Sequence, residues 1–101
     1  MTPEIEARLQ SFGIGLVAES PVVSIFVRDV CVAMAGRGAG GSLSLGSTGM
    51  MTENGLAYLV WRDGQPRLAA KSGEAAAAPE QVEAIHRFSD DLRKALQLTE
   101  P

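Results

Sequence analysis

The chain has 101 residues, of which 46% are hydrophobic and 21% charged, with a formal net charge of −3 and a pI near 5.0. This composition predicts one globular domain, 1–101, with a single modest core, and excludes wholesale disorder. Its lysines and arginines are scattered, whereas a nucleic-acid backbone needs a basic patch, so we expect no nucleic-acid partner. The acidic N-terminus precedes no apolar segment, and no apolar run reaches bilayer length. We therefore expect a cytoplasmic protein without a signal peptide or a membrane partner.

The first twenty residues predict a helix and a strand. Thr2 followed by proline is typical of a helix start, and apolar residues at helical spacing continue to Phe12, just before a glycine. These signals predict a helix over 3–12. The segment Ile14–Glu19 then has the composition of a short strand, which ends at a Ser-Pro pair.

The next segment, Val22–Ala35, is too rich in β-branched residues for a helix. We predict two strands divided by a tight turn at Arg28–Asp29, and a bulge at this position is the alternative. Alternation along the first strand puts its valines and isoleucine on one face, and Phe26 with its polar neighbours on the other. The residues of that first face are Val23, Ile25 and Val27.

A glycine-rich region follows, from Gly36 to Ser47. Its few leucines predict that it returns to the core, and we expect it to be the most flexible part of the chain. A short irregular helix before Asn54–Gly55 is an alternative, although Gly46 and Gly49 weigh against it.

The C-terminal half predicts a β-hairpin and a long helix. Leu56–Arg62 is β-branched and aromatic, Asp63–Pro66 has turn chemistry, and Arg67–Lys71 alternates polar and apolar residues. Ala75–Ala78 is interpreted as a linker. Pro79 then begins an amphipathic helix, whose apolar stripe consists of Val82, Ile85, Phe88, Leu92 and Leu96.

The predicted fold is therefore α+β: an antiparallel sheet of about five strands with an N-terminal and a C-terminal helix, in the order α-β-β-β-(α)-β-β-α. The strand 56–62 is apolar on both faces, and two helices cannot easily cover both sides of a sheet. Either it is a buried central strand, or a second copy covers one face as a homodimer. The predicted dimer interface consists of Leu56, Tyr58, Val60 and Trp61.

The glycine-rich region also contains a possible phosphate-binding loop. Gly36–Gly41 satisfies G-x-G-x-x-G, and Arg37–Ser42 approaches the coenzyme A loop of small N-acetyltransferases. Either site requires a helix directly after the loop, so that backbone N–H groups meet the phosphate. The residues that follow have poor helix propensity. A flexible connector is the favoured interpretation, and a small ligand or coenzyme bound at Gly36–Ser42 is the alternative.

No catalytic constellation is recognisable. His86 is the single histidine and lies away from the apolar stripe, Cys31 lies among valines without a predictable base, and Asp90 and Asp91 point about 100° apart on a helix. We expect no enzyme activity, no cofactor and no metal.

The order of elements resembles the bacterial class I type III secretion chaperones of the Tir-chaperone type. The similarity covers nearly the whole chain: the opening helix Ile5–Gly13, the passage Met50–Trp61 into a long strand, and the final helix from Pro79. The resemblance implies a non-enzymatic homodimer that binds the N-terminal segment of an effector protein and keeps it competent for secretion.

Two sheet-edge segments, 14–19 and 22–28, are apolar with few charges. An extended partner chain adds backbone hydrogen bonds along such an edge and places alternate side chains against apolar residues. We predict that the partner-binding residues are Ile14, Leu16 and Phe26. The alternative is that the apolar residues of these segments fill the core under the two helices. A dimeric regulatory adaptor with a folded partner is the alternative.

Overall fold

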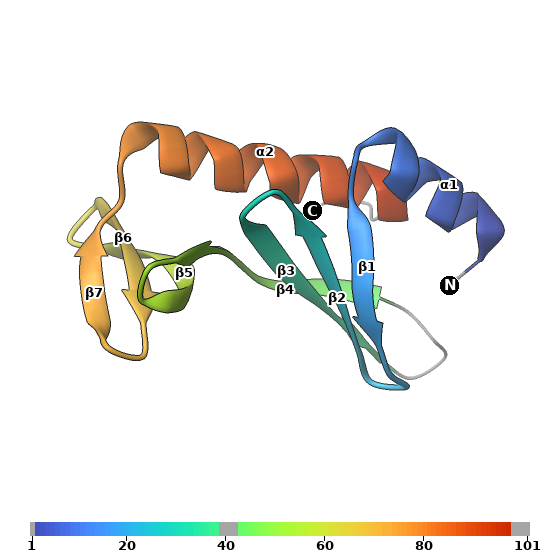
Figure 1. Ribbon diagram of the computed structural model, residues 1–101, viewed down its shortest axis with the longest axis horizontal. Coiled ribbons are helices and arrows are strands. Elements are labelled where there is room, and N and C mark those ends of the chain that lie inside the picture. Colours follow the sequence, from blue (N-terminus) through green and yellow to red (C-terminus); the bar gives the residue numbers. More distant parts are fainter. Residues whose placement is uncertain (1, 39–42, 98–101) are drawn as a thin grey trace.

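The computed structural model describes residues 2–38 and 43–97, and it shows one antiparallel sheet with both helices on the same side (Figure 1). Each strand pairs with its neighbours in the chain, in the order β1-β2-β3-β4-β5-β6-β7. The elements are α1 (Pro3–Ser11), β1 (Gly15–Glu19), β2 (Val23–Arg28), β3 (Cys31–Arg37), β4 (Leu43–Thr52), β5 (Gly55–Arg62), β6 (Gln65–Ala70), β7 (Gly73–Ala76) and α2 (Pro79–Leu96). The α+β class and the two terminal helices are as predicted. Neither helix is long and apolar enough to cross a membrane.

The predicted number of about five strands was wrong, because β4 and β7 were not anticipated. Leu43–Thr52 is a strand, where the sequence suggested a flexible connector or a short helix. It pairs with β3 on one side and β5 on the other, so backbone hydrogen bonds along both edges outweigh the poor β-propensity of its glycines. β7 includes two of the four alanines interpreted as a linker, and it pairs with β6 across the turn Lys71–Ser72.

The tight turns place small or acidic residues at positive φ. Asp29 has a φ of 55° in the turn between β2 and β3, which confirms the predicted division of that segment. In the central hairpin, Asp63 and Gly64 have φ values of 51° and 76°, as a two-residue type I′ turn requires. This turn is shorter than the four-residue link predicted, since Gln65 and Pro66 already belong to β6.

The core lies between the sheet and α2. Phe88 and Leu92 of the predicted helix stripe are fully buried, and they belong to the same cluster as Phe26 of β2 and Ala35 of β3. Leu9 joins this core from α1 and is 3% exposed. The inward-facing residues of every strand from β2 to β6 contribute to this one layer.

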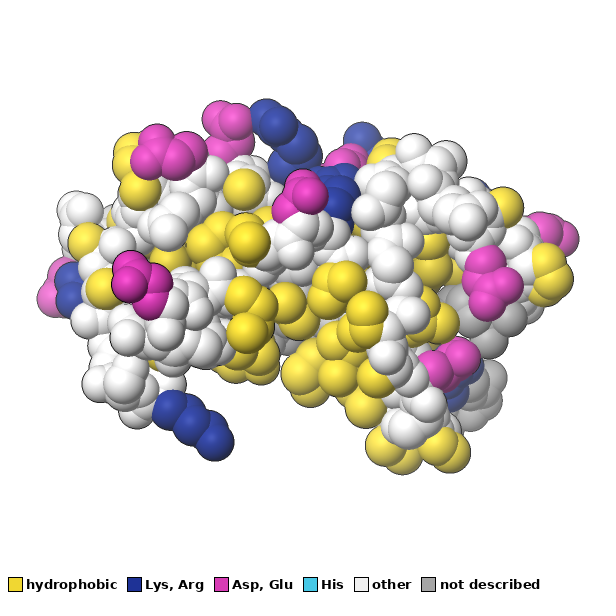
Figure 2. All heavy atoms as spheres, in the orientation of Figure 1, with side chains coloured by type: hydrophobic (Ala, Val, Ile, Leu, Met, Phe, Trp, Pro, Cys, Tyr) yellow, Lys and Arg dark blue, Asp and Glu magenta, His cyan; other side chains and the backbone are white. Residues whose placement is uncertain are grey.

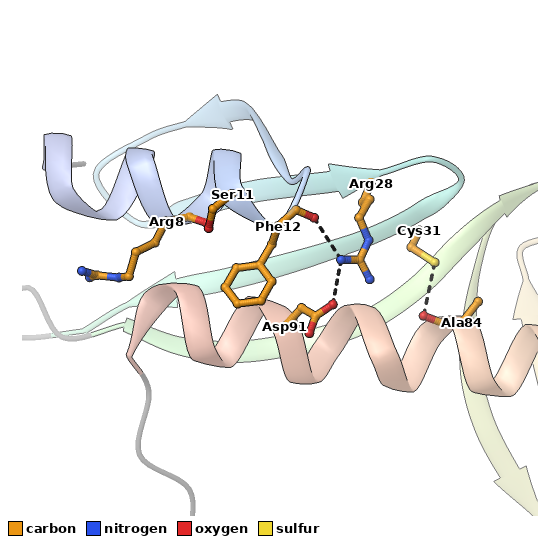
Figure 3. A network of polar contacts seen from close by, with 7 residues as sticks. All are labelled: Arg8, Ser11, Phe12, Arg28, Cys31, Ala84 and Asp91. Atoms are coloured by element: carbon orange, nitrogen blue, oxygen red, sulfur yellow. Dashed lines mark hydrogen bonds and ion pairs between the residues drawn. The ribbon is translucent and has the colours of Figure 1, made fainter.

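A polar network ties α1, β2 and α2 together (Figure 3). The Arg28 guanidinium donates to the backbone carbonyl of Phe12 at 3.1 Å and to the Asp91 carboxylate at 2.8 Å. It also lies 5.4 Å from the centroid of the Phe88 ring. Arg8 of α1 donates to the carbonyl of Ala95 at 2.8 Å. Both arginines thus satisfy carbonyl groups at helix C-termini, which have no partner within their own helix.

Candidate functional site

Within residues 2–38 and 43–97, one face of the sheet carries no helix (Figure 1). Along β2 the buried residues Ser24 and Phe26 face the helices, so the alternate residues face away. β3 continues the pattern, since Cys31, Ala33 and Ala35 are buried and the residues between them are only partly buried. Sequence alternation had identified the two faces of β2 correctly. It had not indicated that the face carrying Ser24 and Arg28 is the one that α2 covers.

Apolar side chains dominate this uncovered face. Figure 2 shows hydrophobic side chains gathered over β2 and β3 in the middle of the view. We define the apolar patch by the partly buried or exposed residues of β2 to β5 that alternate with core residues. They are Val23, Ile25, Val27, Val32, Met34, Met51, Leu56, Tyr58 and Val60. None of them is charged.

A cross-strand row runs through the middle of the patch, and Gly49 lies at its centre. The pairs are Val27 with Val32, Val32 with Gly49, and Gly49 with Tyr58. A Cβ atom at Gly49 would collide with the carbonyl oxygen of Ala57 on β5 and lie 2.9 Å from its carbonyl carbon. The Tyr58 hydroxyl reaches the Met34 sulfur at 3.8 Å, so the ring extends across the patch. Glycine at this position allows β4 and β5 to approach closely under Tyr58.

Charged residues begin at the far end of the face. Arg62 donates to Glu74 at 2.7 Å, and Arg67 lies 3.3 Å from the same carboxylate. The hydrogen bond from Arg62 holds the pKa of the Glu74 carboxyl below its usual value. This cluster marks the polar boundary of the patch on β5 to β7.

The free edge at β1 forms a second candidate surface. β1 is the first strand of the sheet and pairs only with β2. Its register shifts between Leu16 and Ala18, and the bulged residue Val17 is 59% exposed. A groove of ≈ 460 Å³ separates this strand from α1, and Glu6 is its single charged lining residue. Its lining residues are Pro3, Glu6, Ala7, Leu9, Gln10, Ile14, Gly15 and Leu16.

The predicted partner-binding residues need correction. Ile14 is 5% exposed and Phe26 is fully buried, because both face the helices and fill the core. Leu16 is partly buried and packs against the same core. Burial therefore prevents Phe26 from contacting a partner. Ile14 and Leu16 line the groove beside α1 with the exposed part of each residue.

The residues predicted for a dimer interface divide between the two faces. Leu56, Tyr58 and Val60 lie on the uncovered face. Trp61 alternates to the side of Ala57 and Leu59, yet it is 53% exposed. It is therefore not part of the apolar patch.

The residues considered as catalytic candidates lie apart from one another. Cys31 is buried, its thiol contacts the Ala84 carbonyl at 3.7 Å, and burial raises its pKa. His86 is exposed on α2, and Asp91 pairs with Arg28, a contact that sequence spacing does not reveal. Within 2–38 and 43–97, no group of three or more metal-ligating side chains lies close enough together to hold an ion.

The possible coenzyme loop lies between two strands, β3 and β4. Gly36 and Arg37 belong to β3, and Arg37 pairs with Glu19 at 3.3 Å. Residues 39–42 of this loop lie outside the described part of the chain. In the described part of the chain the next element is the strand β4 from Leu43, where a phosphate site would require the N-terminus of a helix.

Comparisons with protein-family models, with curated proteins and with solved structures found no significant match to this chain. The function is therefore inferred from the geometry of the sheet. The order of elements differs in two respects from the one expected from the chaperone resemblance, because β4 occupies the place of the middle helix and β7 is an additional strand.

Proposed function

We propose that this protein is a non-enzymatic, chaperone-like binding protein that holds an extended segment of a partner protein in the cytoplasm. The free edge of β1 beside the groove against α1 supports this proposal. An unpaired strand edge presents N–H and C=O groups in the spacing of another strand. The class I secretion chaperones, which the sequence resembles, use an N-terminal effector segment as their partner.

The groove determines what kind of segment fits. A strand added to β1 places alternate side chains toward Leu9, Ile14 and Leu16 at the base of the groove. The exposed Val17 side chain adds apolar contact at the edge itself. Glu6 at the rim favours a lysine or arginine on the partner. The proposed partner is therefore an extended segment with alternating apolar residues and a basic residue at one side.

Co-purification from the native cell identifies the partner, and a synthetic peptide of the recovered segment then tests the site. Ala7→Trp fills the groove from an exposed position on α1, so we expect at least a tenfold loss of peptide affinity in calorimetry. His86→Trp is the matched control, because it adds the same side chain at an exposed helical position on α2 and leaves the groove unchanged.

Three results contradict the proposal. The first is equal affinity of the Ala7→Trp and His86→Trp variants for the peptide. The second is recovery of a partner that binds only when folded, which favours the regulatory-adaptor alternative. The third is turnover of a small-molecule substrate by the purified protein.

A further inference from the structure

The apolar patch requires an explanation of its own, because the β1 edge and the groove lie elsewhere. Nine residues on four adjacent strands form one continuous surface without a charge. Monomeric proteins rarely leave an apolar patch of more than a few hundred Å² in water. A sheet with one solvated face normally alternates apolar residues toward the core and polar residues toward water. Here both faces of β5 are apolar, and the uncovered face of β2 consists of Val23, Ile25 and Val27.

The size of the face indicates what covers it. With strands about 4.8 Å apart and about 3.3 Å per residue, the four strands of the patch, which average about eight residues, present roughly 500 Å². A single docked helix, about 10 Å wide, covers on the order of 200 Å² of this face. Two such patches packed together bury about 1,000 Å², which is the lower limit expected of a biological interface.

The charge distribution favours a second copy in particular. In a two-fold interface each side chain meets the same surface on the partner, so a charged patch places like charges near one another. The patch is uncharged. At its end Arg62 and Arg67 share the carboxylate of Glu74, which leaves a net charge of +1. Lys71 borders the patch beside Tyr58. The centre of the surface is therefore compatible with itself, and the positive charges lie at its margin.

We infer that this protein forms a homodimer in which the uncovered faces of two sheets pack against each other. Tyr58 and Met34 lie near the centre of this interface, and the Gly49 row passes beneath them. The helices of each copy remain on the outside, and so does the α1–β1 groove. The dimer uses a surface different from that of the proposed function, so either proposal stands if the other fails.

Sedimentation equilibrium of the full chain tests the inference. We expect a species of twice 10.6 kDa at tens of micromolar. Tyr58→Glu and Ile25→Glu each place a carboxylate in the centre of the interface, and each should raise the dimer dissociation constant at least ~30-fold. Trp61→Glu and Val22→Glu are the matched controls, because these residues are 53% and 68% exposed and lie outside the patch.

Far-UV circular dichroism shows whether each variant is folded. Folded, monomeric Tyr58→Glu and Ile25→Glu together with dimeric controls support the inference. A monomeric wild-type chain overturns it. A dimer that survives both patch substitutions, or that Trp61→Glu dissociates equally well, also overturns it. Should a patch variant not fold, Val60→Lys at the margin of the patch repeats the test. That variant must raise the dissociation constant, and a dimer as tight as the wild type overturns the inference.

Discussion

Substitution of Gly49 by alanine should destabilise the protein strongly. Alanine in a strand interior is normally preferred to glycine by about 0.5–1 kcal/mol, because it loses less conformational entropy on folding. At Gly49 the new methyl group collides with the carbonyl oxygen of Ala57, and this atom belongs to the backbone of the neighbouring strand. A side chain can rotate away from such a contact, but the backbone of β5 cannot move without breaking its own pairing with β6.

Overpacking of this kind typically costs about 1–3 kcal/mol, so we expect Gly49→Ala to lower the free energy of unfolding by about 2 kcal/mol. For a domain of this size the melting temperature falls by about 10 °C, since each kcal/mol corresponds to about 4–8 °C. Urea denaturation followed by circular dichroism measures the change. All samples need the same protein concentration, because the stability of a dimer depends on it.

Gly36→Ala is the matched control within the same sheet. Its added Cβ has only the Ser44 hydroxyl near it, at 3.8 Å, and its φ is not in the left-handed region. We expect this variant to be as stable as the wild type or slightly more stable. Equal denaturation midpoints for Gly49→Ala and Gly36→Ala would refute the close-approach argument.

Four further predictions follow from single side chains. Ser24→Ala should leave stability unchanged or raise it by about 1 kcal/mol in urea denaturation, because the fully buried hydroxyl has no hydrogen-bond partner; a clear loss would contradict this. Cys31 should react slowly with iodoacetamide at pH 8 until urea unfolds the chain, because the thiol is buried and its pKa is raised. NMR titration should find the Glu74 pKa below its usual value, and Arg62→Gln should return it upward. Since the folded pKa is lowered, this pair stabilises the protein above the ordinary carboxyl pKa and ceases to do so as the pH falls through the folded value. Calorimetry with acetyl-coenzyme A should show no binding; micromolar binding abolished by Gly38→Val would instead favour the coenzyme alternative.

The strongest local signals in the sequence correctly predicted where the two terminal helices begin and where the hairpins turn. Thr2 accepts a hydrogen bond from the Ile5 backbone N–H at 3.3 Å, as a helix N-cap does, and Pro79 begins α2 as predicted. The Asp63–Gly64 turn and the divided strands around Asp29 were also recognisable, because turn chemistry is decided by a few neighbouring residues.

Tertiary structure alone decided the two unexpected strands. β4 contains Gly46 and Gly49, and β7 consists mainly of glycine and alanine, so the propensities of these residues do not favour a strand. They are strands because a paired neighbour offers them a complete set of backbone hydrogen bonds, and that information lies in the adjacent strand.

Tertiary structure also decided which face of the sheet is buried. Alternation places Val23, Ile25 and Val27 on one face of β2, and Phe26 with two polar neighbours on the other. The first face is the more apolar, so the pattern by itself favours burying it, whereas the structure turns the second face toward the helices. The choice depends on long-range partners: Arg28 reaches Asp91 and the end of α1, and Phe26 fills the space beside Phe88. The sequence by itself therefore determined the α+β class, the terminal helices and the division of residues between two faces. Only the packing of α2 determined which face became the core and which remained uncovered.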